Sequence, residues 1–178
     1  MKRHVILITG ETGAGKTTLI INLIAELNNL GIRISGIFSP ARIQSGRKTG
    51  IYALEISTGV KKLLAVHQPG WDIDNPVREW KMDPEILKWG DAVIQNSVPT
   101  NVLIIDELGF LEFEKNMGWI SAFKILDVGE YKSAIVVVRK GLLDKALEKF
   151  ENAEVITLSD PSQTKENTRI LVSQILAI

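Results

Sequence analysis

Hydrophobic and polar residues follow one another along this chain in blocks that predict alternating strands and helices. Short runs rich in β-branched residues predict buried strands, at residues 4–9, 33–39, 102–106, 133–138 and 154–158. Longer segments predict helices, at residues 16–30, 83–96, 118–126, 142–150 and 164–178. This alternation favours an α/β fold, with a mostly parallel central sheet that has helices on both faces.

The stretch Arg42–Val66 departs from that alternation. It contains three short strand-like runs, and turn residues at 45–50 and 57–59 separate them. Consecutive strands joined by short turns predict an antiparallel meander added to the parallel sheet. The next stretch, Gln68–Met82, holds two prolines and several polar residues, so a loop is expected there.

The composition narrows the function classes. The chain has 178 residues, 45% of them hydrophobic, so we expect a single domain over residues 1–178. Lys plus Arg and Asp plus Glu both total 21, so nucleic acid is not strongly indicated as a partner, and a protein partner is left open. The absence of cysteine excludes disulfides, thiolate zinc sites and a cysteine nucleophile. No apolar run approaches the ~18 residues of a membrane helix, so the expected location is the cytoplasm, away from membranes.

The sequence GETGAGKTT interrupts the most hydrophobic part of the chain at residues 10–18. It satisfies the spacing G-x-x-x-x-G-K-[ST], after a predicted strand and at the start of a predicted helix. Glycines let successive backbone N–H groups point into one concavity, where the helix N-terminus also favours an anion. We therefore expect nucleotide phosphates to contact the whole loop: Gly10, Glu11, Thr12, Gly13, Ala14, Gly15, Lys16, Thr17 and Thr18.

Within this loop the lysine and the threonines have different expected roles. Lys16 is expected to reach the β- and γ-phosphates, and the Thr17 hydroxyl to take one position on Mg²⁺. Thr18 either touches the α-phosphate or caps the helix.

A second acidic element is expected opposite the loop. The apolar run Val102–Ile105 predicts a buried strand, and Asp106 follows at its carboxyl end, where open α/β sheets bind ligands. Asp106 is expected to hold Mg²⁺, and Glu107 to orient and deprotonate an attacking water. An ordinary exposed carboxylate is the alternative for Glu107. The pair of carboxylates favours water over another acceptor.

Three stretches, GETGAGKTTLI, ISGIFSPARIQSGRKTGIYAL and VLIIDELGFLEF, resemble the small P-loop nucleoside-triphosphatases described from thermophiles, also called cancer-related nucleoside-triphosphatases. The resemblance implies a RecA-like sheet, dependence on Mg²⁺, and hydrolysis of ATP, GTP and other nucleoside triphosphates with weak base selectivity. It also implies a second nucleotide-contacting segment, formed by Leu103, Ile104, Ile105, Asp106, Glu107, Leu108, Gly109 and Phe110. Phe110 is a departure, because the family often has a lysine there.

Two arginines are further candidates for catalysis. Arg42 follows the second predicted strand and is expected to face the γ-phosphate, unless it is solvated at a strand end. Arg139 follows the run SAIVVV and is expected to neutralise charge in the transition state, with a salt bridge to Glu107 or solvent exposure as alternatives. Lys48 is interpreted as surface charge, although with Arg42 it could form a basic rim. Glu112 is interpreted as solvated.

Two other functions remain open from the residues. A small-molecule or nucleotide kinase would use the same phosphate loop with an acceptor hydroxyl or phosphate in place of water. A P-loop switch or accessory protein, similar to the accessory protein of molybdopterin-guanine dinucleotide synthesis, would bind nucleotide with slow turnover.

Overall fold

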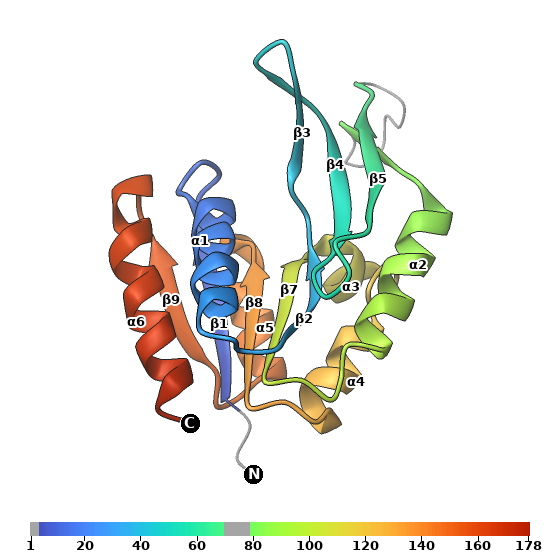
Figure 1. The fold of residues 1–178 in the computed structure, drawn as a ribbon. Coiled ribbons are helices and arrows are strands. Elements are labelled where there is room, and N and C mark those ends of the chain that lie inside the picture. The colour runs from blue at the N-terminus through green and yellow to red at the C-terminus, as the bar shows by residue number, and fades with distance from the viewer. Residues whose placement is uncertain (1–3, 70–78) are drawn as a thin grey trace.

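A twisted sheet with helices on both faces forms the body of the molecule, and a long antiparallel extension rises from one end (Figure 1). The computed structural model describes residues 4–69 and 79–178. Within these residues the strand order is β6-β5-β4-β2-β7-β8-β1-β9, and β3 pairs with β4 outside that path. The strands are β1 His4–Gly10, β2 Ile34–Phe38, β3 Ala41–Gln44, β4 Arg47–Glu55, β5 Lys61–His67, β6 Trp80–Met82, β7 Val102–Leu108, β8 Ser133–Val138 and β9 Glu154–Leu158.

The parallel half of the sheet consists of β2, β7, β8, β1 and β9, in which every neighbouring pair is parallel. All five strands were predicted from their apolar runs. Because parallel strands end at the same edge, the residues that follow β1, β7 and β8 meet above the sheet. In the register, Ile8 and Asp106 both lie opposite Val137 of β8. The phosphate loop and the acidic pair are therefore separated by the width of one strand.

The antiparallel half consists of β3, β4, β5 and β6, and it confirms the predicted meander. It joins the parallel half through an antiparallel pairing of β2 with β4. The loop expected over Gln68–Met82 is wrong at its end, because Trp80–Met82 forms β6 and pairs with β5. All three residues of that short strand pair with β5, Trp80 with His67, Lys81 with Val66 and Met82 with Ala65. The rest of the expected loop, at residues 70–78, lies outside the described residues.

Six α-helices are described: α1 Lys16–Asn29, α2 Pro84–Gln95, α3 Phe110–Lys115, α4 Ser121–Val128, α5 Leu143–Lys149 and α6 Thr164–Leu176. One core cluster buries α1 and α6 against one face of the parallel strands, and a second buries α2, α4 and α5 against the other. The two faces alternate along each strand, as Leu103 and Ile104 of β7 show by packing into different clusters. None of the helices in the described ranges is both long and apolar enough to cross a membrane.

The short helix α3 was not predicted. It follows β7 directly, and the Glu112 carboxylate accepts the backbone N–H of Gly109, 2.8 Å away, at its N-terminus. Asp83 plays the corresponding role at α2, where its side chain accepts the N–H groups of Glu85 and Ile86.

Candidate active site

The phosphate loop runs from the end of β1 to the start of α1. Gly10 and Gly15 have φ angles of +146° and +94°, which L-residues with side chains rarely adopt. A Cβ atom on Gly10 would lie 2.4 Å from the carbonyl oxygen of Leu158, and one on Gly15 would lie 2.7 Å from Cγ2 of Thr164. The loop is thus held closely against the end of β9 and the start of α6, and both positions require glycine.

Lys16 lies across this loop. Its Nζ donates to the carbonyl oxygens of Gly10 and Glu11, at 2.7 and 2.9 Å. Among the described residues, no side chain caps the N-terminus of α1, which leaves its first N–H groups available to an anion. Thr17 and Thr18 are exposed beside them. The structure therefore brings together the groups that the sequence assigned to phosphate.

Asp106 lies at the carboxyl end of β7 and is 6% exposed. The backbone N–H of Ser39, which follows β2, donates to Oδ2 of Asp106 at 3.2 Å, and the Ser39 hydroxyl donates to the Asp106 carbonyl. Burial, together with the neighbouring Glu107, raises the pKa of Asp106 to about 7, although Ser39, Lys16 and Lys48 act in the opposite direction. A nearby cation would therefore stabilise the charged carboxylate.

Arg139 follows β8, between the phosphate loop and the acidic pair, and its Nε donates to Oε1 of Glu107. This is one of the arrangements left open by the sequence. The next residue, Lys140, forms an ion pair with Glu11 at 2.8 Å, and its hydrogen bond lowers the pKa of the Glu11 carboxyl. The two successive cations thus pair in different directions, Arg139 with Glu107 of β7 and Lys140 with Glu11 of the phosphate loop.

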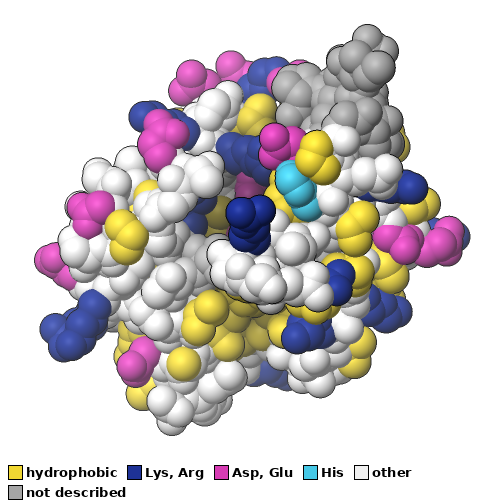
Figure 2. All heavy atoms as spheres, turned by 90° about the horizontal axis from the view of Figure 1, so that it is seen from above, with side chains coloured by type: hydrophobic (Ala, Val, Ile, Leu, Met, Phe, Trp, Pro, Cys, Tyr) yellow, Lys and Arg dark blue, Asp and Glu magenta, His cyan; other side chains and the backbone are white. Residues whose placement is uncertain are grey.

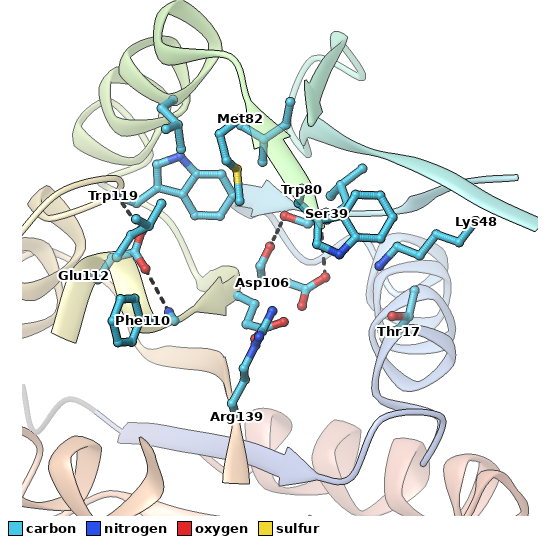
Figure 3. A pocket seen from close by; sticks show the side chains of 16 residues that line it. Thr17, Ser39, Lys48, Trp80, Met82, Asp106, Phe110, Glu112, Trp119 and Arg139 are labelled. Atoms are coloured by element: carbon cyan, nitrogen blue, oxygen red, sulfur yellow. Dashed lines mark hydrogen bonds and ion pairs between the residues drawn. The ribbon is translucent and has the colours of Figure 1, made fainter. Parts of the chain in front are cut away.

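The meander contributes Lys48 to the site and leaves Arg42 outside. Arg42 lies on β3, which pairs only with β4 among the described strands, and it does not line the hollows described below. This placement favours the alternative, a partly exposed arginine at a strand end, over a contact with the γ-phosphate. Lys48 of β4 instead points toward Asp106 in Figure 3, and its Nζ lies 4.8 Å from the ring centroid of Trp80. Burial lowers the pKa of Lys48 although the residue is exposed overall, and the residue lines both hollows described below.

Two hollows meet at these residues. The outer hollow, of about 770 Å³, extends over the phosphate loop to Lys140, Gly141 and Pro161. The inner cavity, of about 170 Å³, lies between the end of β7, the meander, α2 and α3 (Figure 3). Five residues line both: Thr17, Lys48, Trp80, Glu107 and Arg139. In Figure 2, which looks down on this end, Lys and Arg side chains gather near the middle of the face.

The donor groups fit a magnesium ion that binds together with its substrate. Thr17 and Asp106 offer a hydroxyl and a carboxylate, the hard oxygen ligands that Mg²⁺ prefers, and both line the inner cavity. No cluster of three or more His, Cys, Asp or Glu in the described ranges could hold a metal alone. Water and phosphate oxygens would therefore complete the coordination.

Several expected contacts are excluded by burial. Leu103, Ile104, Ile105 and Leu108 are 0% exposed, so their side chains cannot touch a nucleotide. The expected segment therefore narrows to Asp106, Glu107, Gly109 and Phe110, which line the inner cavity. Ala14 is also buried, at 3% exposure. At Ala14, therefore, only the backbone of the loop can contact phosphate.

Glu112 is buried, at 7% exposure, and the interpretation that it is solvated is wrong. Its two oxygens accept the N–H groups of Gly109 and Trp119, at 2.8 and 2.9 Å. Burial raises the pKa of Glu112, and these hydrogen bonds oppose the rise. The spacing G-x-x-E at residues 109–112 resembles a helix-capping pattern, and it was the signal that could have revealed this role.

Comparison with known proteins agrees with this geometry. A family model described as NTPase matches residues 5–176. The chain belongs to this NTPase family. The match covers both the phosphate loop and the Asp106–Glu107 pair, and it confirms the resemblance recognised in the sequence.

Individual relatives carry the name nucleoside-triphosphatase THEP1. The chain is 28% identical over 110 residues to the protein of Caldivirga maquilingensis. These aligned residues make up 61% of each chain. It is 26% identical over 168 residues to that of Methanocaldococcus jannaschii, which covers 82% of this chain and 96% of the relative. The chain thus spans about three fifths of the first of these relatives.

A human cancer-related nucleoside triphosphatase has a similar solved structure, with a TM-score of 0.76. The similarity covers 99% of this chain and 98% of the human one, at 22% sequence identity. This shows a shared fold, in agreement with the predicted α/β architecture and its mostly parallel sheet.

Proposed function

We propose that the protein hydrolyses nucleoside triphosphates, ATP and GTP among them, to nucleoside diphosphate and phosphate in the presence of Mg²⁺. The observation that carries the proposal is that Thr17, at the start of α1, and Glu107, at the end of β7, line the same two hollows. Family membership and the name shared by the relatives support it.

The residues divide the reaction between them. The backbone N–H groups of the loop and the Lys16 ammonium neutralise the β- and γ-phosphate oxygens. Glu107 orients the attacking water and accepts its proton as the oxygen bonds to the γ-phosphorus. The bond from that phosphorus to the β–γ bridging oxygen breaks, and its electron pair stays on the nucleoside diphosphate. Arg139, already beside Glu107, adds positive charge where the transition state gains negative charge.

Magnesium, held by Thr17 and Asp106, would supply Lewis-acid neutralisation of the β- and γ-oxygens. Weak base selectivity is part of the proposal. Beside the phosphate loop, the outer hollow is also lined by Lys140, Gly141 and Pro161, and the one polar side chain among them is paired with Glu11. These three residues offer no fixed pattern of donors and acceptors for a single base.

Phosphate release from ATP, GTP, CTP and UTP, with and without Mg²⁺, tests the proposal directly. Glu107→Gln should retain nucleotide binding and lower turnover by roughly 10²–10⁴-fold, the usual contribution of a general base. Glu151→Gln, at an exposed position, is the matched control and should leave turnover unchanged. Unchanged turnover in Glu107→Gln would remove Glu107 from the mechanism, and absence of phosphate release in the unmodified protein would refute hydrolysis.

A further inference from the structure

The inner cavity has an apolar wall and a charged end. Ile51 and Leu64 of the meander, Leu87 of α2 and Trp119 form part of the wall. The charged end is formed by Asp106, Glu107, Lys48 and Arg139. All of these except Asp106 also line the outer hollow. A reaction in which water is the only acceptor does not require an apolar chamber beside the γ-phosphate.

The size of the cavity corresponds to a small organic molecule. Its volume of about 170 Å³ compares with the ~150 Å³ of an engineered apolar cavity in another protein that binds benzene. A single six-membered ring or a short branched chain with one polar group would therefore fill it.

We propose that the inner cavity binds a second substrate, a small uncharged alcohol with an apolar body, whose hydroxyl accepts the γ-phosphoryl group in place of water. The inference rests on the proposed nucleotide site, because the hydroxyl must meet a γ-phosphate bound at Lys16 and Thr17. It adds a phosphotransferase activity to the hydrolysis.

The charges at the polar end favour an uncharged ligand. Asp106 and Glu107 stand there with Lys48 and Arg139, and Arg139 is already paired with Glu107. An anionic ligand would meet the two carboxylates and a cationic one the two basic groups, whereas a hydroxyl can donate to a carboxylate without adding charge.

The transfer step uses groups already assigned. The alcohol oxygen forms a bond to the γ-phosphorus, and the bond between that phosphorus and the β–γ bridging oxygen breaks. The electron pair stays on the bridging oxygen of the nucleoside diphosphate, and the hydroxyl proton passes to the Glu107 carboxylate. The products are an alkyl phosphate and a nucleoside diphosphate.

Binding can be measured by NMR with cyclohexylmethanol, an uncharged probe of suitable size. The indole N–H resonance of Trp119, assigned with Trp119→Phe, should shift on titration of the full chain, because this ring lines the cavity. Cyclohexanecarboxylate, of the same shape but charged, should cause little shift. An unmoved resonance with the alcohol, or equal binding of the carboxylate, would overturn the proposal.

Leu87 and Ile51 are half-buried, line the cavity and are not reactive groups. Leu87→Trp should fill the cavity, and Ile51→Phe is a second variant in case the first does not fold. Either should weaken cyclohexylmethanol binding at least about tenfold. Leu176→Trp, at an exposed position far along α6, is the control. Binding that is unaffected by either folded variant would place the alcohol elsewhere.

Transfer is measured with γ-labelled ATP, Mg²⁺ and saturating cyclohexylmethanol, by separating alkyl phosphate from inorganic phosphate. We expect alkyl phosphate from the unmodified protein, and its loss in the filled variants while phosphate release to water continues. Binding without alkyl phosphate would overturn the acceptor role. If the unmodified protein released no phosphate in the absence of alcohol, that result would instead count against the proposed hydrolysis. Failure of the acceptor role and failure of hydrolysis are therefore distinguishable.

Discussion

The parallel and antiparallel halves of the sheet contribute different things to the site. The parallel half supplies the reactive groups at its carboxyl edge, with Lys16 after β1, Asp106 in β7 and Arg139 after β8. The antiparallel half supplies one cation, Lys48, and part of the apolar wall of the inner cavity. Reactive groups thus follow from the order of parallel strands, whereas the shape of the space beside them depends on pairing within the meander.

The largest effect is expected in the parallel half. Lys16→Ala should lower kcat/KM for ATP by roughly 10²–10³-fold, because it removes a cation directed at the transferred phosphoryl group. It should also weaken nucleotide binding, as measured by calorimetry. Lys165→Ala, at an exposed position on α6, should change neither quantity. Activity within a few-fold of the unmodified protein would show that the loop does not hold the reacting phosphates.

In the parallel half, the segment that follows β7 depends on Glu112. Glu112→Ala should lower the free energy of unfolding by about 3 kcal/mol, since it leaves the N–H groups of Gly109 and Trp119 without their acceptor in a buried setting. Chemical denaturation followed by circular dichroism measures this change. Glu114→Ala, on the same helix, is the matched control: its ion pair with Lys145 is partly exposed, so its loss should cost less than about 1 kcal/mol. Equal costs would contradict a structural role for Glu112.

A smaller effect is expected for the cation of the antiparallel half. Lys48→Met should lower kcat/KM about tenfold, because Lys48 is one positive charge among several at the shared rim. Lys61→Met on β5 removes a lysine that lies over an aromatic ring in the same way, 4.6 Å from the centroid of Tyr52, but outside both hollows. If both variants behave alike, the meander contributes only shape.

The smallest effect concerns pH. Burial raises the pKa of Glu112 above its ordinary value of 4.5. Between pH 4.5 and the pKa of the folded state, the folded protein therefore binds more protons than the unfolded protein. Stability from this group is therefore fully present below pH 4.5 and falls as the pH rises through the folded pKa, by at most about 1.4 kcal/mol per pH unit. Unfolding free energies of the unmodified protein and of Glu112→Gln, measured across this range, should fall more steeply in the former, because Asp106, whose pKa is raised to about 7, contributes a fall to both.

The sequence predicted the parallel half well because its signals are local. The glycine spacing of residues 10–17 and the apolar run before Asp106 each identify a strand end without reference to the rest of the chain. The Arg139–Glu107 pair could be foreseen only as an alternative, since it requires that β8 lie beside β7.

The antiparallel half was predicted in outline and not in detail. Whether Lys48 or Arg42 faces the site depends on the pairing of β3 with β4 and on the shift in register between Arg42 and Ile43, which local sequence does not specify. The strand β6 has only three residues and gains its hydrogen bonds from β5, so its own sequence carries little information. Glu112 looked solvated because burial of its carboxylate depends on Trp119, in the segment that follows α3.

The close approach of the phosphate loop to the C-terminal part of the chain has a consequence for synthesis. The loop precedes most of the chain in translation, but Gly10 pairs with Leu158 and Gly15 abuts Pro161 and Thr164. A nascent chain emerging from the ribosome therefore lacks the surfaces that shape its own loop until those residues have been translated. The loop is completed by residues more than a hundred positions later in the chain, so its final shape is a late event in the maturation of the polypeptide.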